Sequence, residues 1–319
     1  MPEGERDRPR QGAGRGGGRP AGRRWAIIDT ITVLTSTSQK YATKRIHRRG
    51  AAVTKSGYGN EAYFRAEERP VGSFADLVRE LERLTVEPYS FVIRGAPLPG
   101  VDRRRHRRLL KPHDGIPATY SAAPRHDFAI DLDKLPRPEG IDPVTDPEGA
   151  IEHLVGLLPP ELAETSMYWQ FTASQGLPGA DTLSARLWLW AEEALADDDL
   201  REWALGANAA HGDKLIDPSL YRAVQPHYVA APIFTGMADP LPRRSGVRQG
   251  RHVCAMPVLL RALRAVDDHL ATIGGPKGFR EPIVSAIAAY VAKNGADAPR
   301  SDRGSEVMTI SPATAATST

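Results

Sequence analysis

The chain has 319 residues, of which 41% are hydrophobic and 25% are charged, as in an ordinary soluble globular protein. It contains no run of about eighteen apolar residues, and no apolar segment follows the basic N-terminus. These two features argue against a membrane span and a secretory signal. The single cysteine, Cys254, excludes an internal disulfide and a cysteine-based zinc ribbon. We therefore expect a cytoplasmic protein with no membrane partner.

The charge is distributed unevenly. Residues 1–24 contain seven arginines and three acids and so carry a formal charge of +4. The whole chain carries +3, so the remaining residues carry −1. This Arg/Gly-rich tail has almost no apolar residues and is expected to be disordered. It could hold phosphates loosely or serve only as a solvated linker. Because the rest of the chain is not basic, nucleic-acid binding there would require local patches.

Strand and helix patterns alternate irregularly after this tail. Strands are expected over residues 25–34, 89–93, 126–133, 168–174 and 184–190. A helix is expected to begin at Ser73, which is a suitable N-cap with Asp76 in the capping-box position. Further helices are expected over residues 147–158, 197–210, 256–273 and 281–293. Residues 35–63 and 217–250 show no clear period and are expected to be irregular. The mixture predicts an α/β or α+β fold rather than a regular parallel βαβ array.

The strongest local signal is the sequence Asp131-Leu132-Asp133 within an apolar strand. Because side chains alternate along a strand, both aspartates face one side, and Phe128, Ile130 and Leu132 face the other. Two carboxylates this close cannot both be buried and ionised without a counter-charge. A pair of Mg²⁺ or Mn²⁺ ions is one solution, and two such ions can hold the attacking and leaving oxygens of a phosphoryl transfer. The alternative is that both acids lie on the solvent side of an edge strand.

A second signal lies in the next two strands, which could form a hairpin. The first ends in a turn of hydroxyl and glycine residues that includes Ser174. The second carries Ser184 and Arg186 on the same face as Trp188 and Trp190. A turn of this kind with a nearby guanidinium can hold a triphosphate. The two tryptophans are expected in the core.

Three further features carry weaker signals. Asp217 precedes a proline, where an aspartate is usually a turn or cap residue. His227 is expected to be structural rather than a ligand. A run of arginines reads either as a solvated loop or as a phosphate-binding patch. Its members are Arg103, Arg104, Arg105, Arg107 and Arg108.

Taken in order, these segments resemble the primase-polymerase domain of the archaeo-eukaryotic primase superfamily, of the type found in plasmids, phages and integrated mobile elements. The resemblance covers about residues 85–257. It rests on Phe-Ala-Ile-Asp-Leu-Asp, Tyr-Trp-Gln-Phe-Thr-Ala-Ser-Gln-Gly, Ser-Ala-Arg-Leu-Trp-Leu-Trp and Ile-Asp-Pro-Ser-Leu-Tyr-Arg-Ala-Val-Gln-Pro-His-Tyr-Val-Ala-Ala-Pro. The family fold packs an RRM-like catalytic half on an N-terminal α/β unit. By this resemblance residues 25–255 form the primase-polymerase-like domain and residues 256–294 a short C-terminal helical element. Residues 295–319 are expected to be a disordered tail.

The resemblance also implies roles for individual residues. The family has an hhhDhD strand, an s-x-H strand and a later h-D. Asp131 and Asp133 match the first motif and Asp217 the last, so these three would be catalytic and would bind two Mg²⁺ or Mn²⁺ ions. Arg186 stands where the family has histidine, and it offers a permanent charge and a wider fork but does not titrate near pH 7. Three side chains would contact the nucleotide phosphates: Ser174, Ser184 and Arg186.

The implied function is that of a DNA primase or primase-polymerase. Such an enzyme performs metal-dependent, template-directed nucleotidyl transfer from nucleoside triphosphates on single-stranded DNA, here in replication of a plasmid, phage or integrated mobile element. The arginine run and the N-terminal tail would attract the template backbone. No Walker A pattern occurs, so the chain is expected to be a stand-alone primase-like protein, with a separate replicative helicase as partner, or a shortened version of a longer primase-helicase.

Two alternatives remain open. Arg186 and the absence of a helicase motif favour a catalytically degenerate primase-fold protein that binds nucleic acid in replication initiation. The other alternative is a soluble α/β protein in which the Asp-x-Asp sequence is incidental.

Overall fold

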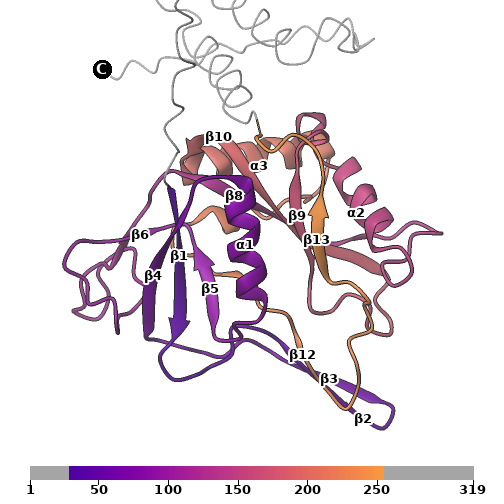
Figure 1. Cartoon of the computed structure of the whole chain (residues 1–319), viewed down its shortest axis with the longest axis horizontal. Helices are drawn as coiled ribbons and strands as arrows, with labels where there is room; N and C mark the ends of the chain where they lie inside the picture. Colours follow the sequence, from indigo (N-terminus) through magenta and orange to yellow (C-terminus); the bar gives the residue numbers. More distant parts are fainter. Residues whose placement is uncertain (1–28, 255–319) are drawn as a thin grey trace, which may run out of the picture.

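Figure 1 shows the computed structural model, which describes residues 29–254. The expected tails at 1–24 and 295–319, the helical element at 256–294 and the start of the first predicted strand lie outside the described residues. Within them the fold is mixed α+β, with antiparallel sheets and few helices, as the sequence predicts. None of the described helices is long and apolar enough to cross a membrane.

The N-terminal half is built on a four-stranded antiparallel sheet in the order β11-β5-β1-β4. Its strands are β1 (Asp29–Ser36), β4 (Phe64–Val71), β5 (Ser90–Ile93) and β11 (His227–Tyr228). Two short strands, β6 (Ala96–Pro97) and β7 (Tyr120–Ser121), pair beside this sheet. The last strand to join, β11, comes from far along the chain, so the C-terminal part of the sequence completes the N-terminal sheet.

Helix α1 (Phe74–Thr85) packs between the two halves. It begins where the sequence predicts, because the Ser73 hydroxyl accepts a hydrogen bond from the Asp76 amide at 3.1 Å and itself donates to the Asp76 carboxylate at 2.8 Å. Its apolar side packs into one cluster with the N-terminal sheet and with Trp188 and Trp190 of the C-terminal sheet. In Figure 1 the helix accordingly lies between the two sheets.

The C-terminal half contains a second four-stranded antiparallel sheet, in the order β13-β9-β10-β8. Its strands are β8 (Arg125–Pro136), β9 (Met167–Phe171), β10 (Thr182–Leu195) and β13 (Ser245–Arg248). Two helices, α2 (Pro147–Gly156) and α3 (Asp197–His211), cover the face that carries Phe128, Ile130 and Leu132. The opposite face presents Trp188 and Trp190 to α1, so both tryptophans are core residues, as predicted.

A buried arginine joins the two halves. Arg94, which follows β5, is almost fully buried and donates from Nε to Asp197 at the start of α3, at 2.6 Å. It also donates to the backbone carbonyls of Asp127 and Leu195. Buried ion pairs of this kind require every donor to be used, and here the three donating nitrogens reach three acceptors on the C-terminal half.

A third sheet projects from the body of the molecule at the lower right of Figure 1. Strands β2 (Arg45–Arg49) and β3 (Ala52–Ser56) form a hairpin, and β12 (Ile233–Thr235) pairs in parallel with β2. Ile46 is fully buried. Gly236 has a φ of 73°, and a Cβ there would lie 2.5 Å from the carbonyl oxygen of Arg48, so only glycine permits this close approach. The hairpin is therefore anchored along one side.

The prediction of irregular structure is wrong for two segments. Residues 35–63 contain the β2–β3 hairpin, and residues 217–250 contribute β11, β12 and β13 to three different sheets. Strand β4 is also absent from the sequence prediction. Most of these strands are short, and β11, β12 and β13 pair with strands far away in sequence, so their local pattern is weak. Two 3₁₀ turns complete the described elements: η1 (Pro160–Leu162) and η2 (Pro218–Tyr221).

Candidate functional site

Four polar side chains form a row across one face of the C-terminal sheet. Arg186 on β10 lies opposite Asp131 on β8 and opposite Gln170 on β9. Gln170 in turn lies opposite Ser245 on β13. Because directly opposed residues point to the same side of a sheet, all four share the face that carries Trp188. The row is therefore the place where this face changes from apolar core to polar surface.

The centre of the row is a two-pronged ion pair. Arg186 donates from Nε to Asp131 Oδ1 at 3.2 Å, and its Nη2 lies 3.2 Å from Asp131 Oδ2. The remaining Nη1 donates to the backbone carbonyl of Tyr228 at 3.2 Å. The two side chains are 14% and 24% exposed, so the pair is accessible from solvent. A guanidinium in this geometry could bind a phosphate in place of the carboxylate, because either anion offers two oxygens that accept parallel hydrogen bonds.

This ion pair lines a cavity of about 200 Å³ that residues from both halves surround. Lys44 and Tyr58 come from the N-terminal half, and Tyr228 comes from β11. The rings of Tyr58 and Tyr228 are stacked, with centroids 3.6 Å apart, and Tyr58 is 40% exposed. The cavity thus offers a guanidinium, a carboxylate and an aromatic surface within one small volume.

Lys44 adds a second positive charge to the cavity. Burial lowers its pKa, and the neighbouring Lys55 lowers it further, whereas Asp133 and Asp131 act in the opposite direction. The two carboxylates and the two lysines therefore interact electrostatically across the site. An anionic ligand in the cavity would meet Lys44, Arg186 and the Asp131 carboxylate, whereas Asp133 is not among the lining residues.

Asp133 is held by one of the two serines that the sequence assigned to phosphates. The Ser184 hydroxyl donates to Asp133 Oδ1 at 3.0 Å and accepts from the Lys134 amide at 2.8 Å. Ser184 itself is only 6% exposed. Its hydroxyl therefore orients a carboxylate, and it is not among the residues that line the cavity.

Ser174 lies at a neighbouring cleft. Its hydroxyl accepts a hydrogen bond from Lys55 Nζ at 2.7 Å, which links the turn after β9 to the β2–β3 hairpin. Ser174 and Lys55 both line an open cleft of about 450 Å³ between these two segments. The structure thus separates the three expected phosphate contacts: Arg186 lines the cavity, Ser184 binds Asp133, and Ser174 lies in the cleft.

Asp217 is the N-cap of η2, where its side chain accepts from the Ser219 amide at 3.1 Å. Tyr221 at the end of η2 is buried, which raises the pKa of its hydroxyl, and both Asp131 and Asp217 add to that rise. Both carboxylates are therefore within electrostatic reach of one hydroxyl. Within residues 29–254, no three His, Cys, Asp or Glu side chains are placed to hold a metal ion together.

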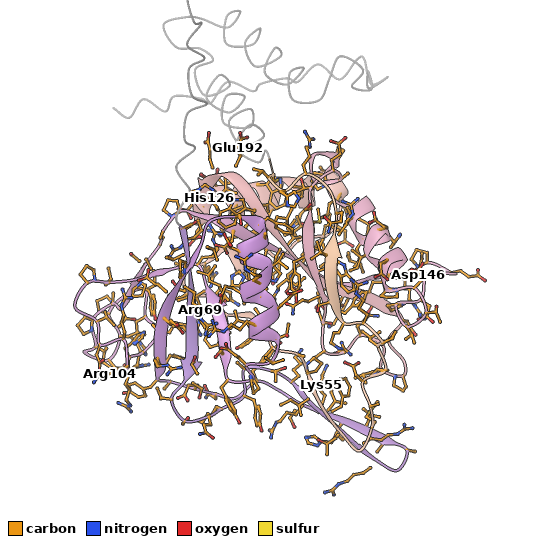
Figure 2. All side chains as sticks on the ribbon, viewed as in Figure 1. Lys55, Arg69, Arg104, His126, Asp146 and Glu192 are labelled. Atoms are coloured by element: carbon orange, nitrogen blue, oxygen red, sulfur yellow. The ribbon has the colours of Figure 1, made fainter. Side chains whose placement is uncertain are left out.

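None of the arginine run lines this cavity, although Arg108 lies beside Tyr228, which does. Figure 2 places Arg104 at the left of the molecule, and Lys55, which belongs to the hairpin, toward the lower right. Most of the run is engaged within the protein: Arg103 pairs with Glu68 at 2.7 Å, Arg105 packs over the Tyr63 ring, Arg107 pairs with Asp114 at 3.4 Å, and Arg108 packs over Phe91. Nucleic-acid binding by this run stays a prediction, and fewer of its charges are free than the sequence indicates.

Sequence reasoning missed Lys44, Lys55 and the Tyr58–Tyr228 stack. The available signal was the charge of residues 44–56, which include lysines and arginines but no acid. His227 is 1% exposed, and burial lowers its pKa well below the usual range, so it is a neutral core residue, as expected. The ion pair between Arg186 and Asp131 could not be read from either residue alone, because it depends on the register of β10 against β8.

Comparison with known proteins adds no relative to this description, since no family model, curated protein or solved structure matches the chain. The function must therefore be argued from the site itself and from the motif resemblance.

Proposed function

We propose that this protein is a primase-polymerase that binds a nucleoside triphosphate in the cavity beside Asp131 and Arg186. It would transfer the nucleotidyl group to a 3′-hydroxyl on a single-stranded DNA template, in replication of a plasmid, phage or integrated mobile element. The observation that carries the proposal is the accessible Arg186–Asp131 pair on the wall of a cavity that also contains Lys44 and stacked tyrosines. Each of these groups suits one part of a nucleotide.

The order of elements in the C-terminal half supports the proposal. Along the chain β8, α2, β9, β10, α3 and β13 follow the β-α-β-β-α-β order of the ferredoxin-like class, to which RRM-type units belong. The sheet order β13-β9-β10-β8 places β8 at an edge, whereas the first strand of an RRM-type sheet is internal. We therefore propose an RRM-like half with a rearranged sheet, in which the edge strand carries Asp131 and Asp133.

The residues of the cavity would act in three ways. Arg186 would exchange Asp131 for phosphate oxygens, because its fork binds either anion with two hydrogen bonds. Lys44 would add a point charge to the triphosphate. Tyr58, which is 40% exposed and has Lys44 Nζ 5.3 Å from its ring centre, would contact the base, since aromatic stacking tolerates every base. The exchange would leave the Asp131 carboxylate without its internal partner only while nucleotide is bound.

Asp131 and Asp133, with Asp217 as the third carboxylate, are the residues that would hold Mg²⁺ or Mn²⁺. Carboxylate oxygens are hard ligands that suit these ions, and Asp131 and Asp133 share one strand, but the described residues do not gather three such groups into one site. When bound, the ions would neutralise phosphate charge and activate the 3′-hydroxyl. Ser184 would keep the Asp133 carboxylate oriented toward the site.

A second candidate function is a primase-fold protein that binds nucleic acid without synthesis. The observation that favours it is the same ion pair, because a permanent guanidinium already neutralises Asp131 where a metal ligand is expected. In that case the cavity would hold a phosphate group of the nucleic acid through Arg186 and Lys44.

Nucleotide incorporation tests the proposal. Purified protein would be incubated with single-stranded DNA, labelled nucleotides and Mg²⁺ or Mn²⁺. The wild type should form product, and Asp131→Ala/Asp133→Ala should form none while keeping the melting temperature within a few degrees. Glu192→Gln is the matched control, because Glu192 is an exposed acid on β10 at the far side of the molecule from Lys55 in Figure 2.

Two results would decide against synthesis at this site. Equal product from the double variant would show that Asp131 and Asp133 are not catalytic. Absence of product from the wild type, with DNA binding intact, would favour the non-catalytic binder.

A further inference from the structure

The β2–β3 hairpin and the residue before it carry positive charge that is not paired with carboxylates. Five cations occur in residues 44–56, with no acid: Lys44, Arg45, Arg48, Arg49 and Lys55. Within residues 29–254, none of these five side chains lies within 4.0 Å of a carboxylate oxygen. The arginine run, by contrast, places two of its five arginines in such pairs. Lys44 and Arg45 lie over the rings of Tyr58 and Tyr41, and Lys55 donates to Ser174. The hairpin therefore differs from the arginine run in that no described carboxylate neutralises its charge.

Three of these cations share one face of the hairpin. Lys55 lies opposite Ile46, and Arg48 lies opposite Val53. Because residues two apart on a strand share a face, Lys44, Arg48 and Lys55 point to the same side. A span of four strand residues is about 13 Å, so the three cations form an extended row rather than a compact cluster.

This row leads outward from the candidate site. Lys44 lines the cavity that contains Asp131 and Arg186. Lys55 and Arg48 line the adjoining open cleft, which the 174–180 turn closes on its other side. The hydrogen bond from Lys55 to Ser174 crosses that cleft at 2.7 Å. The cavity and the cleft have no lining residue in common, but Ala173 of the cavity and Ser174 of the cleft are neighbours in the chain. We call the two together the hairpin groove.

The shape of the groove favours a linear polyanion. A small anion would need several groups that converge on one point, whereas these cations are spread along an open channel. The exposed ring of Tyr58 lies at the inner end, and single strands bind where a positive groove is combined with aromatic side chains. Ile46 and the close contact at Gly236 fix the hairpin, so little ordering cost would attend binding.

We propose that the hairpin groove binds the phosphate backbone of a single-stranded nucleic acid and leads that strand to the cavity beside Asp131. The inference deepens the proposed function. It rests on that function only in stating that the bound strand reaches the cavity. Recognition would be electrostatic and independent of sequence, since lysine and arginine contacts to phosphate carry no base information.

The test compares two pairs of cations by salt-dependent oligonucleotide binding. The full-length protein would be titrated against a fluorescent single-stranded oligonucleotide at several salt concentrations. Arg48→Gln/Lys55→Gln removes two charges from the groove, and Arg104→Gln/Arg107→Gln removes two from the arginine run. Loss of two phosphate contacts should reduce the slope of log K against log salt by about 1.4 in the groove variant. The arginine-run variant should change the slope by less than about 0.7, the value of one contact.

Several outcomes would overturn the inference. Equal reductions in both variants would show diffuse attraction by net charge. An unchanged slope in the groove variant, with an unchanged melting temperature, would show that the groove does not contact phosphate. Binding to phosphatidylserine vesicles but not to the oligonucleotide would assign the charge to a membrane surface.

The same titration separates this inference from the proposed function. Asp131→Ala should bind the oligonucleotide at least as well as the wild type, because it removes a negative charge near the groove. A protein that binds through the hairpin groove but incorporates no nucleotide would refute synthesis and leave the groove assignment standing.

Discussion

Two arginine–aspartate pairs occupy very different places in this molecule. Arg94 and Asp197 are 1% and 8% exposed, and the other donors of Arg94 are used by backbone carbonyls. Arg186 and Asp131 are 14% and 24% exposed and line a cavity. The first pair joins the two halves and is closed to solvent. The second is placed so that either member could change partner, which is the property a binding site requires.

The contrast shows that an ion pair must be interpreted by its surroundings. Breaking a buried pair leaves a charge without solvent, whereas breaking a partly exposed pair lets water replace the partner. Similar chemistry therefore serves structure in one place and is available for function in the other.

The largest effect is expected from Arg94→Met. This change leaves Asp197 buried without its counter-charge and should lower the free energy of unfolding by about 3–5 kcal/mol. Urea denaturation measures it, with Arg186→Met as the matched control, for which we expect a loss of no more than about 1 kcal/mol. Equal losses in the two variants would show that the pairs do not differ in role.

Ser184→Ala tests how the site is attached to the core. The hydroxyl joins Asp133 to the Lys134 amide, and its removal leaves the amide unpaired, at a cost of about 1–3 kcal/mol. We expect nucleotide incorporation to fall as well, because Asp133 loses its orienting donor. Ser174→Ala, which loses a contact to an exposed lysine, should unfold almost as the wild type does. A stable but inactive Ser184 variant would assign the hydroxyl to catalysis alone.

Glu61 provides a carboxylate held without any arginine. Burial acts to raise its pKa, but hydrogen bonds from the hydroxyls of Ser36 and Ser38 and from backbone amides lower it to about 2. Because this folded-state value lies below the ordinary value of 4.5, Glu61 stabilises the fold fully above about pH 4.5 and loses that contribution as the pH falls toward 2.

Glu61→Gln should therefore be less stable than the wild type at pH 7, and the difference should shrink between pH 4.5 and pH 2. Thermal melts of both proteins across this range measure the effect. A difference that does not vary with pH would show that the ionised Glu61 carboxylate does not stabilise the fold through its hydrogen bonds to Ser36 and Ser38.

The smallest effect is expected from the exposed pair of Arg107 and Asp114. At 3.4 Å, with Asp114 68% exposed, the pair should contribute less than about 0.5 kcal/mol. Arg107→Gln should therefore unfold with the wild-type midpoint in urea. A loss above about 1 kcal/mol would show that this loop is held by its charges after all.

Elements with a strong local pattern could be predicted from the sequence. Helix α1 has its capping box at Ser73 and an apolar side with helical spacing, and β8 alternates around Asp131, so both were located correctly. The face shared by Asp131 and Asp133 followed from the same alternation. Strands β11, β12 and β13 could not be found in this way, because each is defined by a distant partner rather than by its own residues.

The site shows the same limit. That Arg186 bonds Asp131 depends on strand register, and that Lys44 reaches the cavity depends on how the hairpin packs. The arginine run illustrates the converse, since its charge is evident in the sequence but largely engaged in the fold. Sequence shows how much charge is present, whereas structure shows how much is free.

Equilibrium binding of a nucleoside triphosphate to the wild type and to Arg186→Gln tests most directly whether the Arg186–Asp131 pair is a binding element. If Arg186 exchanges Asp131 for phosphate, the variant should bind the triphosphate at least tenfold more weakly, a difference of about 1.4 kcal/mol, while the uncharged nucleoside binds both proteins alike. Equal triphosphate affinity for the two proteins would contradict this role and make the Arg186–Asp131 pair a structural one like that of Arg94.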